Sequence, residues 1–89
     1  MVCRMYDVSG ATLDQYDQVN QQLSSEKPDG VRVHIAGESD GGIRVIEVWD
    51  STDDIDRYMQ SGLAEAMQEA GIPEPTITDF EVHKLDWIG

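Results

Sequence analysis

The sequence predicts an α+β fold in which a four-stranded antiparallel sheet carries both of its helices on one face. Three observations predict it: four short segments with strand character, two amphipathic helical segments, and a tight turn between the second and third strands. The elements follow the order strand, helix, strand, strand, helix, strand. Right-handed crossovers place both helices on the same side of such a sheet, which is the ferredoxin-like βαββαβ arrangement.

The first half of the chain predicts one strand and one helix. A strand is expected over residues 2–8, and Ser9-Gly10 ends it. Thr12 followed by Gln15 has the form of a capping box, which marks the start of a helix. Apolar side chains then recur at three- and four-residue steps: Leu13, Tyr16, Val19 and Leu23. Pro28-Asp29-Gly30 is expected to end the connection and begin the next strand.

The central segment predicts a hairpin whose two faces differ in character. Residues 31–36 alternate in polarity, and Asp40-Gly41-Gly42 is a turn signal before a strand over residues 43–49. If the loop has an even number of residues, one face is mixed: Arg32, His34, Ala36, Ile43, Val45, Glu47 and Trp49. The opposite face is then aliphatic: Val33, Ile35, Ile46 and Val48. An odd-length loop would break this assignment.

A second helix and a last strand complete the predicted fold. Ser51, with Asp54 three places on, opens a helix with an unbroken apolar stripe. The stripe comprises Ile55, Tyr58, Met59, Leu63, Ala66, Met67 and Ala70. Gly62 is expected to weaken or bend this helix, and Gly71 with Pro73 to end it. The last strand is expected over residues 76–85, with a bulge near Asp79 where the alternation slips.

Composition narrows the class of protein. The 89 residues carry 18 Asp and Glu against 6 Lys and Arg, a net charge of -12, which disfavours nucleic-acid and membrane-surface partners. No run approaches the ~18 apolar residues of a membrane span and no signal peptide is evident, so a cytoplasmic location is expected. The single Cys3 excludes an intrachain disulfide, and no Cys/His cluster predicts a metal site. One domain over residues 1–89 is marginal alone, so we expect a homodimer through the aliphatic sheet face.

The polar side chains of the mixed face are the candidates for chemistry. His34 nearly opposite Glu47 predicts a general base whose tautomer the carboxylate fixes. The alternative is a cross-strand polar pair that only satisfies its own hydrogen bonds. Arg32 is a candidate for stabilising an oxyanion. His83, on the last strand, is more simply a surface or interface histidine.

Large side chains near the second helix are candidates for shaping a ligand pocket. Trp49 and Tyr58 could line a pocket for a flat aromatic ligand, and Met67 could adapt its lining. Packing in the core is the alternative for each of them.

One segment carries a resemblance to a known family. Val45-Ile46-Glu47-Val48-Trp49-Asp50-Ser51, followed by an amphipathic helix, resembles the dimeric α+β-barrel superfamily, in particular the antibiotic-biosynthesis-monooxygenase-like domains. The runs at 33–37, 40–42 and 80–83 are similar to small uncharacterised members. The resemblance implies a homodimer whose sheets pack face to face, with a ligand cleft between sheet and helices in each subunit. Members of this superfamily include cofactor-independent oxygenases, cyclases, isomerases, haem-degrading enzymes and proteins without known activity, so the fold does not settle the function.

The haem-degrading branch can be tested against this sequence. The resemblance implies that haem-degrading members carry a tryptophan in the helix after the motif and an iron-binding histidine about ten residues further on. Tyr58 stands near the first position and Met67 or Gln68 near the second. A haem protein needs an axial ligand, and this helix contains no histidine, so no haem or other cofactor is expected.

Together these observations predict a small-molecule enzyme or binding domain acting on an apolar or aromatic ligand. Cofactor-independent oxygenation, cyclisation or isomerisation would begin with deprotonation by His34. A non-catalytic dimeric module that binds a ligand or partner is the alternative. A closed cleft without histidine would favour the module.

Overall fold

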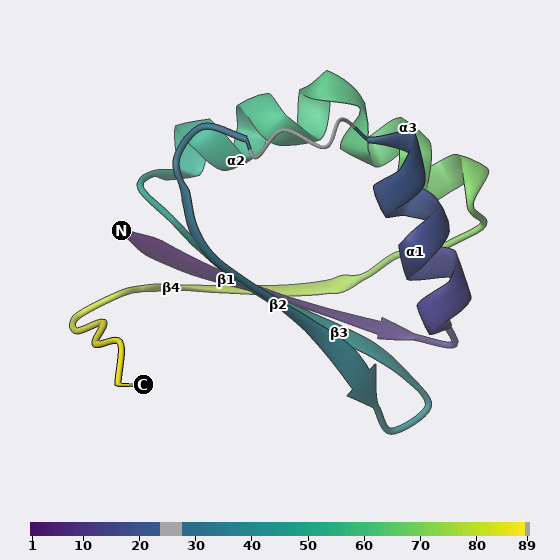
Figure 1. Ribbon diagram of the computed structural model, residues 1–89, viewed down its shortest axis with the longest axis horizontal. Coiled ribbons are helices and arrows are strands. Elements are labelled where there is room, and N and C mark those ends of the chain that lie inside the picture. The colour runs from purple at the N-terminus through teal and green to yellow at the C-terminus, as the bar shows by residue number, and fades with distance from the viewer. Residues whose placement is uncertain (24–27, 89) are drawn as a thin grey trace.

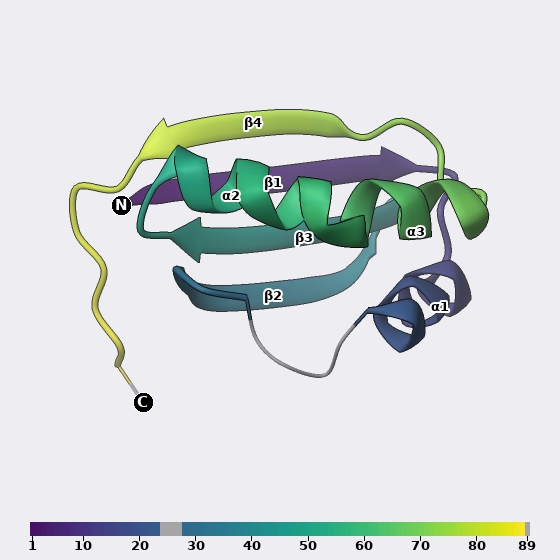
Figure 2. The same cartoon turned by 90° about the horizontal axis from the view of Figure 1, so that it is seen from above.

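The computed structural model describes residues 1–23 and 28–88, and within them it has the expected order of elements (Figure 1). The strands are β1 (Val2–Ser9), β2 (Val31–Ser39), β3 (Gly42–Trp49) and β4 (Thr76–Glu81). They form an antiparallel sheet in the order β2-β3-β1-β4. The helical elements are α1 (Leu13–Gln22), α2 (Thr52–Tyr58), η1 (Met59–Leu63) and α3 (Ala64–Glu69). All of them lie on one side of the sheet, which confirms the α+β prediction (Figures 1 and 2).

Helix α1 begins at the predicted capping box. The Thr12 hydroxyl accepts a hydrogen bond from the Gln15 N–H at 3.2 Å, and the Gln15 side-chain oxygen accepts one from the Thr12 N–H at 3.0 Å. Val19 is buried on the side of the helix that faces the sheet, and Tyr16 is half-buried. Leu13 is 42% exposed, so the buried stripe begins at Tyr16 and not at Leu13.

The β2–β3 hairpin has the even loop that the prediction required. Ser39 pairs with Gly42 across the two-residue turn Asp40-Gly41, and Gly41 adopts φ +74°, which favours glycine. The register places His34 opposite Glu47 and Ile35 opposite Ile46, as predicted.

The predicted alternation fails at the start of β2. A register shift between Val31 and Val33 places Val31 opposite Trp49, so Val31 packs on the helix side and not with Val33. The shift also takes Arg32 out of the row of His34. A bulge adds one residue to one strand, which polarity alternation cannot locate.

The second helical segment is bent at its glycine, as predicted. The Ser51 hydroxyl accepts a hydrogen bond from the Asp54 N–H at 3.3 Å and caps α2. Gly62 has φ +128° and ψ -8°, which lies outside the helical range, and the chain there widens into the π-helical turn η1. Helix α3 ends at Glu69, and Gly71 follows with φ +72°.

The last strand differs from the prediction in two respects. It ends at Glu81, so His83 lies beyond the sheet and is exposed. Its register with β1 is continuous from Thr76 to Glu81, so the bulge expected near Asp79 is absent. Asp79 interrupts the apolar alternation because it forms a two-pronged ion pair with Arg4 on the neighbouring strand, with both contacts at 2.8 Å.

The buried core is divided into two clusters along the sheet. One lies toward the hairpin end: Tyr6, Val8, Ala11, Ile43 and Val45. The other lies where β1 begins and β3 ends: Val2, Trp49 and Ile55. Glu47 stands on β3 between the two clusters and is only 5% exposed. In the described part of the chain, no helix is long and apolar enough to cross a membrane.

Candidate functional site

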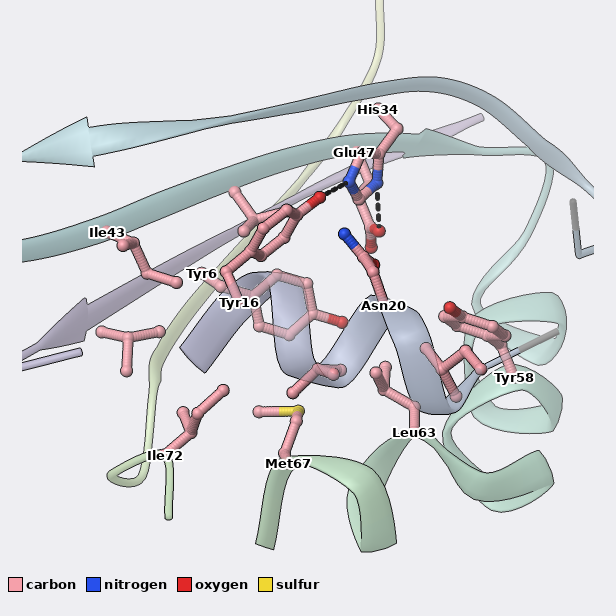
Figure 3. A pocket seen from close by; sticks show the side chains of 14 residues that line it. Tyr6, Tyr16, Asn20, His34, Ile43, Glu47, Tyr58, Leu63, Met67 and Ile72 are labelled. Carbon is pink, nitrogen blue, oxygen red and sulfur yellow. Dashed lines mark hydrogen bonds and ion pairs between the residues drawn. The ribbon is translucent and has the colours of Figure 1, made fainter. Parts of the chain in front are cut away.

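A largely apolar pocket lies between the sheet and the helices, beside Glu47 (Figure 3). Its apolar lining comes from strands and helices alike and includes Val8, Val19, Ile43, Val45, Leu63 and Met67. The space between the lining side chains is about 540 Å³, including some open solvent at the mouth. Water-molecule centres can occupy about 70 Å³ of it. This site has the concave, mostly apolar form of a small-molecule site.

Hydrogen bonds join four side chains at one wall of the pocket. The Tyr16 hydroxyl lies 2.7 Å from His34 Nε2, and His34 Nδ1 lies 2.9 Å from Glu47 Oε2. The Trp49 indole N–H donates to Glu47 Oε1 at 3.1 Å. A carboxylate accepts on both oxygens, so the network assigns the imidazole proton to Nδ1. Nε2 then accepts from the Tyr16 hydroxyl (Figure 3).

The chain of hydrogen bonds runs from the interior to the rim. The Glu47 side chain is 6% exposed, whereas that of His34 is 45% exposed. The buried Glu47 carboxylate accepts from two donors and fixes the His34 imidazole from the interior side. The second imidazole nitrogen is directed toward Tyr16. This is the arrangement of an oriented base with a positioned hydroxyl.

Two further tyrosines line the same pocket. Burial, and then the negative charge of Glu47, raise the pKa of both Tyr6 and Tyr58 above its ordinary value. Both phenols therefore keep their protons near neutral pH and can donate hydrogen bonds. The Tyr58 ring also packs against Trp49, with ring centroids 5.5 Å apart.

Four of the six predicted site residues come together in this pocket. His34, Glu47, Tyr58 and Met67 all line it. Trp49 does not line it: the side chain is fully buried and acts on the site through its hydrogen bond to Glu47.

Arg32 is held away from the row of His34 and Glu47. It forms an ion pair with Asp50, with contacts of 2.7 and 2.8 Å, and its side chain is 59% exposed. It borders a second cleft, which His34, Glu47 and Tyr58 also line.

Sequence reasoning missed the tyrosines at positions 6 and 16. Tyr16 was only a member of an apolar helical stripe, and Tyr6 was only part of a short strand. Both lie on core-facing positions where a phenol must place its hydroxyl in the interior or at its edge. That signal was available in the sequence, although the partner of the Tyr16 hydroxyl was not.

Metal chemistry finds no support in the described residues. Within residues 1–23 and 28–88, no group of three or more His, Cys, Asp or Glu side chains is placed to hold a metal ion.

Comparison with known proteins identifies the fold. No family model and no curated protein matches the sequence. Among solved structures, the chain is similar to a candidate antibiotic biosynthesis monooxygenase from Deinococcus radiodurans, with 18% identity, 100% and 99% of the two chains covered, and a TM-score of 0.66. It is also similar to a mutant of SnoaB, a cofactor-independent oxygenase from Streptomyces nogalater, with 16% identity, 94% and 92% coverage, and a TM-score of 0.64.

A third solved structure has a bound porphyrin. It is a mutant of MhuD with two manganese protoporphyrin IX molecules per active site, with 18% identity, 100% coverage of both chains and a TM-score of 0.61. The molecule is thus a small α+β protein with an internal apolar pocket. Its fold is that of these three solved structures, one of which is a candidate antibiotic biosynthesis monooxygenase, in agreement with the fold that the sequence resemblance implied.

Proposed function

We propose that the chain is a small-molecule enzyme of the monooxygenase-like type that binds an apolar or aromatic ligand in this pocket and removes a proton from it. The observation that carries the proposal is the chain of hydrogen bonds Tyr16–His34–Glu47 in the wall of an apolar pocket. If His34 and Glu47 formed only a structural polar pair, their position in the wall of a pocket would have no explanation. Removal of a proton from a phenol or enol begins cofactor-independent oxygenation, cyclisation and isomerisation alike.

The hydrogen bonds support one path for the proton. Since the Tyr16 hydroxyl covers His34 Nε2, a ligand proton passes to the Tyr16 oxygen while the Tyr16 proton passes to Nε2. The positive imidazolium is then stabilised by Glu47 at 2.9 Å. Trp49 keeps the other carboxylate oxygen in place.

Two measurements on the wild-type protein test this function without knowledge of the natural substrate. Phenylacetone carries one aromatic ring and an activated carbon-bound proton. NMR titration should show its binding through resonances of the pocket, and proton NMR in D₂O should show faster exchange of its activated protons with solvent.

The alternative module predicts a different pair of results. Binding without accelerated exchange would establish a non-catalytic ligand-binding protein. No binding of any one-ring ligand would sink the proposed pocket function altogether.

We further propose that the chain forms a homodimer through the sheet face turned away from the helices. That face carries Cys3, Met5, Val33, Ile35, Ile46, Val48 and Phe80, as the strand register and alternation require. Ile35 is 55% and Phe80 is 52% exposed. The segment after β4 passes to the same side of the sheet, and its Trp87 and Ile88 are each 92% exposed (Figure 1). Cys3 and Val48 are already buried, but large apolar side chains exposed together on one face typically mark an interface.

Ile35→Lys is expected to convert the dimer to a monomer. The substitution places a charge in the proposed interface, on the edge strand β2, where it would be buried without a partner. Light scattering at micromolar concentration and about 150 mM salt should report twice the chain mass for the wild type and the single mass for the variant.

Leu13→Lys is the matched control for this experiment. Leu13 is also exposed, at 42%, but it lies on α1 on the other side of the sheet. A monomeric wild type, or equal effects of both substitutions, would contradict the proposed interface.

Haem is expected not to bind stoichiometrically. In the helical segment 52–69, Tyr58 stands near the position where the haem branch carries tryptophan, and Met67 or Gln68 stands near the position of the iron ligand. Both nitrogens of His34 already hold hydrogen bonds. The residues present therefore do not fit haem. Titration with haem should give no sharp, shifted Soret band. If such a band appears, His34→Ala and His83→Ala would reveal which histidine ligates the iron.

A further inference from the structure

The Tyr6 hydroxyl is the feature of the pocket that the proposed proton transfer leaves unexplained. The residue is 6% exposed, and its hydroxyl has no hydrogen-bond partner in residues 1–23 and 28–88. Figure 3 shows the ring on the strand side of the pocket, with the hydroxyl directed into the space that the lining side chains surround. Buried hydroxyl groups nearly always have a partner, so an exception calls for an explanation.

The charged neighbours of this hydroxyl are already engaged. The Arg4 guanidinium carbon lies 6.0 Å from the centre of the Tyr6 ring, and two of its nitrogens bind Asp79. The two oxygens of Glu47 accept from His34 and Trp49. Arg4 can act on the Tyr6 oxygen only as a donor, because a guanidinium has no acceptor to offer, and the Glu47 oxygens are held by other donors. The Tyr6 phenol is therefore a free donor facing the pocket.

We infer that the Tyr6 hydroxyl positions the ligand by donating a hydrogen bond to a carbonyl or similar oxygen acceptor on it. This inference rests on the proposed function of the pocket and adds the chemical class of what it binds. A preorganised donor in a low-dielectric site binds an oxygen acceptor more strongly than it would in water. Nearby Arg4 adds positive potential that favours a partly negative oxygen.

The size of the pocket limits the rest of the ligand to about one ring. The space open to water-molecule centres is about 70 Å³. An engineered closed cavity that binds benzene has about 150 Å³, roughly twice this space, so a single ring fits here only because the pocket is open at its mouth. The ligand we infer is therefore a monocyclic, mostly apolar compound with a carbonyl-type oxygen.

The choice of tyrosine at this position supports a role in binding. Phenylalanine would fill the same volume without burying an unpartnered hydroxyl, which favours phenylalanine if the position serves only packing. Tyr6→Phe should therefore keep or raise the melting temperature of the ligand-free protein, while the preference for an oxygen acceptor is lost.

A matched pair of probes tests the inference directly. Acetophenone carries a carbonyl oxygen, and α-methylstyrene has nearly the same shape with a methylene group in its place. Calorimetric or NMR titration of the wild type should show acetophenone binding about tenfold more tightly. Tyr6→Phe should bind the two probes equally and keep the wild-type affinity for α-methylstyrene. If Tyr58→Phe, and not Tyr6→Phe, removes the preference, Tyr58 is the donor and the role inferred for Tyr6 is overturned.

The outcomes separate this inference from the function on which it rests. If neither probe binds, the pocket function fails and this inference with it. If both bind equally to the wild type, the pocket function stands and the role of Tyr6 is refuted. A lower melting temperature of ligand-free Tyr6→Phe would also refute it, because the hydroxyl would then stabilise the fold.

Discussion

His34→Ala is expected to lower the rate of proton exchange from a bound carbon acid by about 10²–10⁴-fold, the usual contribution of a positioned general base. Without the imidazole, the Tyr16 hydroxyl has no acceptor for its proton, and Glu47 is left in the wall with nothing to orient. The fold should tolerate the change. Because the His34 side chain is 45% exposed, water can replace it as a donor to Glu47, and the loss of stability should be about 1 kcal/mol.

The second histidine of the chain provides the matched control. His83 lies after β4, outside the pocket, and is exposed, so His83→Ala should leave both exchange and ligand binding unchanged.

Tyr16→Phe separates two routes for the proton. Loss of exchange in this variant places Tyr16 on the path, whereas retained exchange means that His34 acts directly. A His34→Ala protein with full activity, or one whose activity only follows its folded fraction, would establish the structural alternative.

The pairing of His34 with Glu47 could be predicted because it depends only on local rules. Side chains alternate along a strand, and a turn with an even number of residues fixes which positions face each other. Asp40-Gly41 provided such a turn, and the register followed. The same rules missed the bulge near Val31, since an extra residue leaves no mark on the pattern of polarity.

The contact between Tyr16 and His34 could not be predicted in the same way. The two residues come from α1 and β2, and their meeting depends on the angle at which the helix crosses the sheet. That angle results from packing among many side chains of both core clusters. The free hydroxyl of Tyr6 was equally hidden, because a missing partner is a property of the assembled interior.

The division of the core explains why a pocket exists in so short a chain. Tyr6, Ile43 and Val45 fill the sheet toward the hairpin, and Trp49 with Ile55 fill it at the other end. The helical segment 52–69 is bent at Gly62, so it cannot pack an unbroken row of side chains against the sheet. Glu47 stands where that row would otherwise pass, and the space beside it becomes the candidate site.

Trp49→Ala is expected to reduce the free energy of unfolding by about 3–5 kcal/mol, because the indole is fully buried and nothing nearby can fill its volume. Domains of this kind have only about 5–15 kcal/mol in total, so the variant should be close to unfolding at 37 °C. Trp49→Phe keeps most of the packing but removes the N–H that holds Glu47 Oε1. It should lose less stability, about 1–3 kcal/mol, yet slow proton exchange through a misplaced carboxylate. Urea denaturation followed by circular dichroism measures both losses.

Trp87, the other tryptophan, provides the control because it is 92% exposed. Trp87→Ala should leave the free energy of unfolding of each subunit unchanged. Any loss of stability that it causes through the dimer should vary with protein concentration. A Trp49→Ala protein as stable as the wild type would show that Trp49 does not anchor this end of the core.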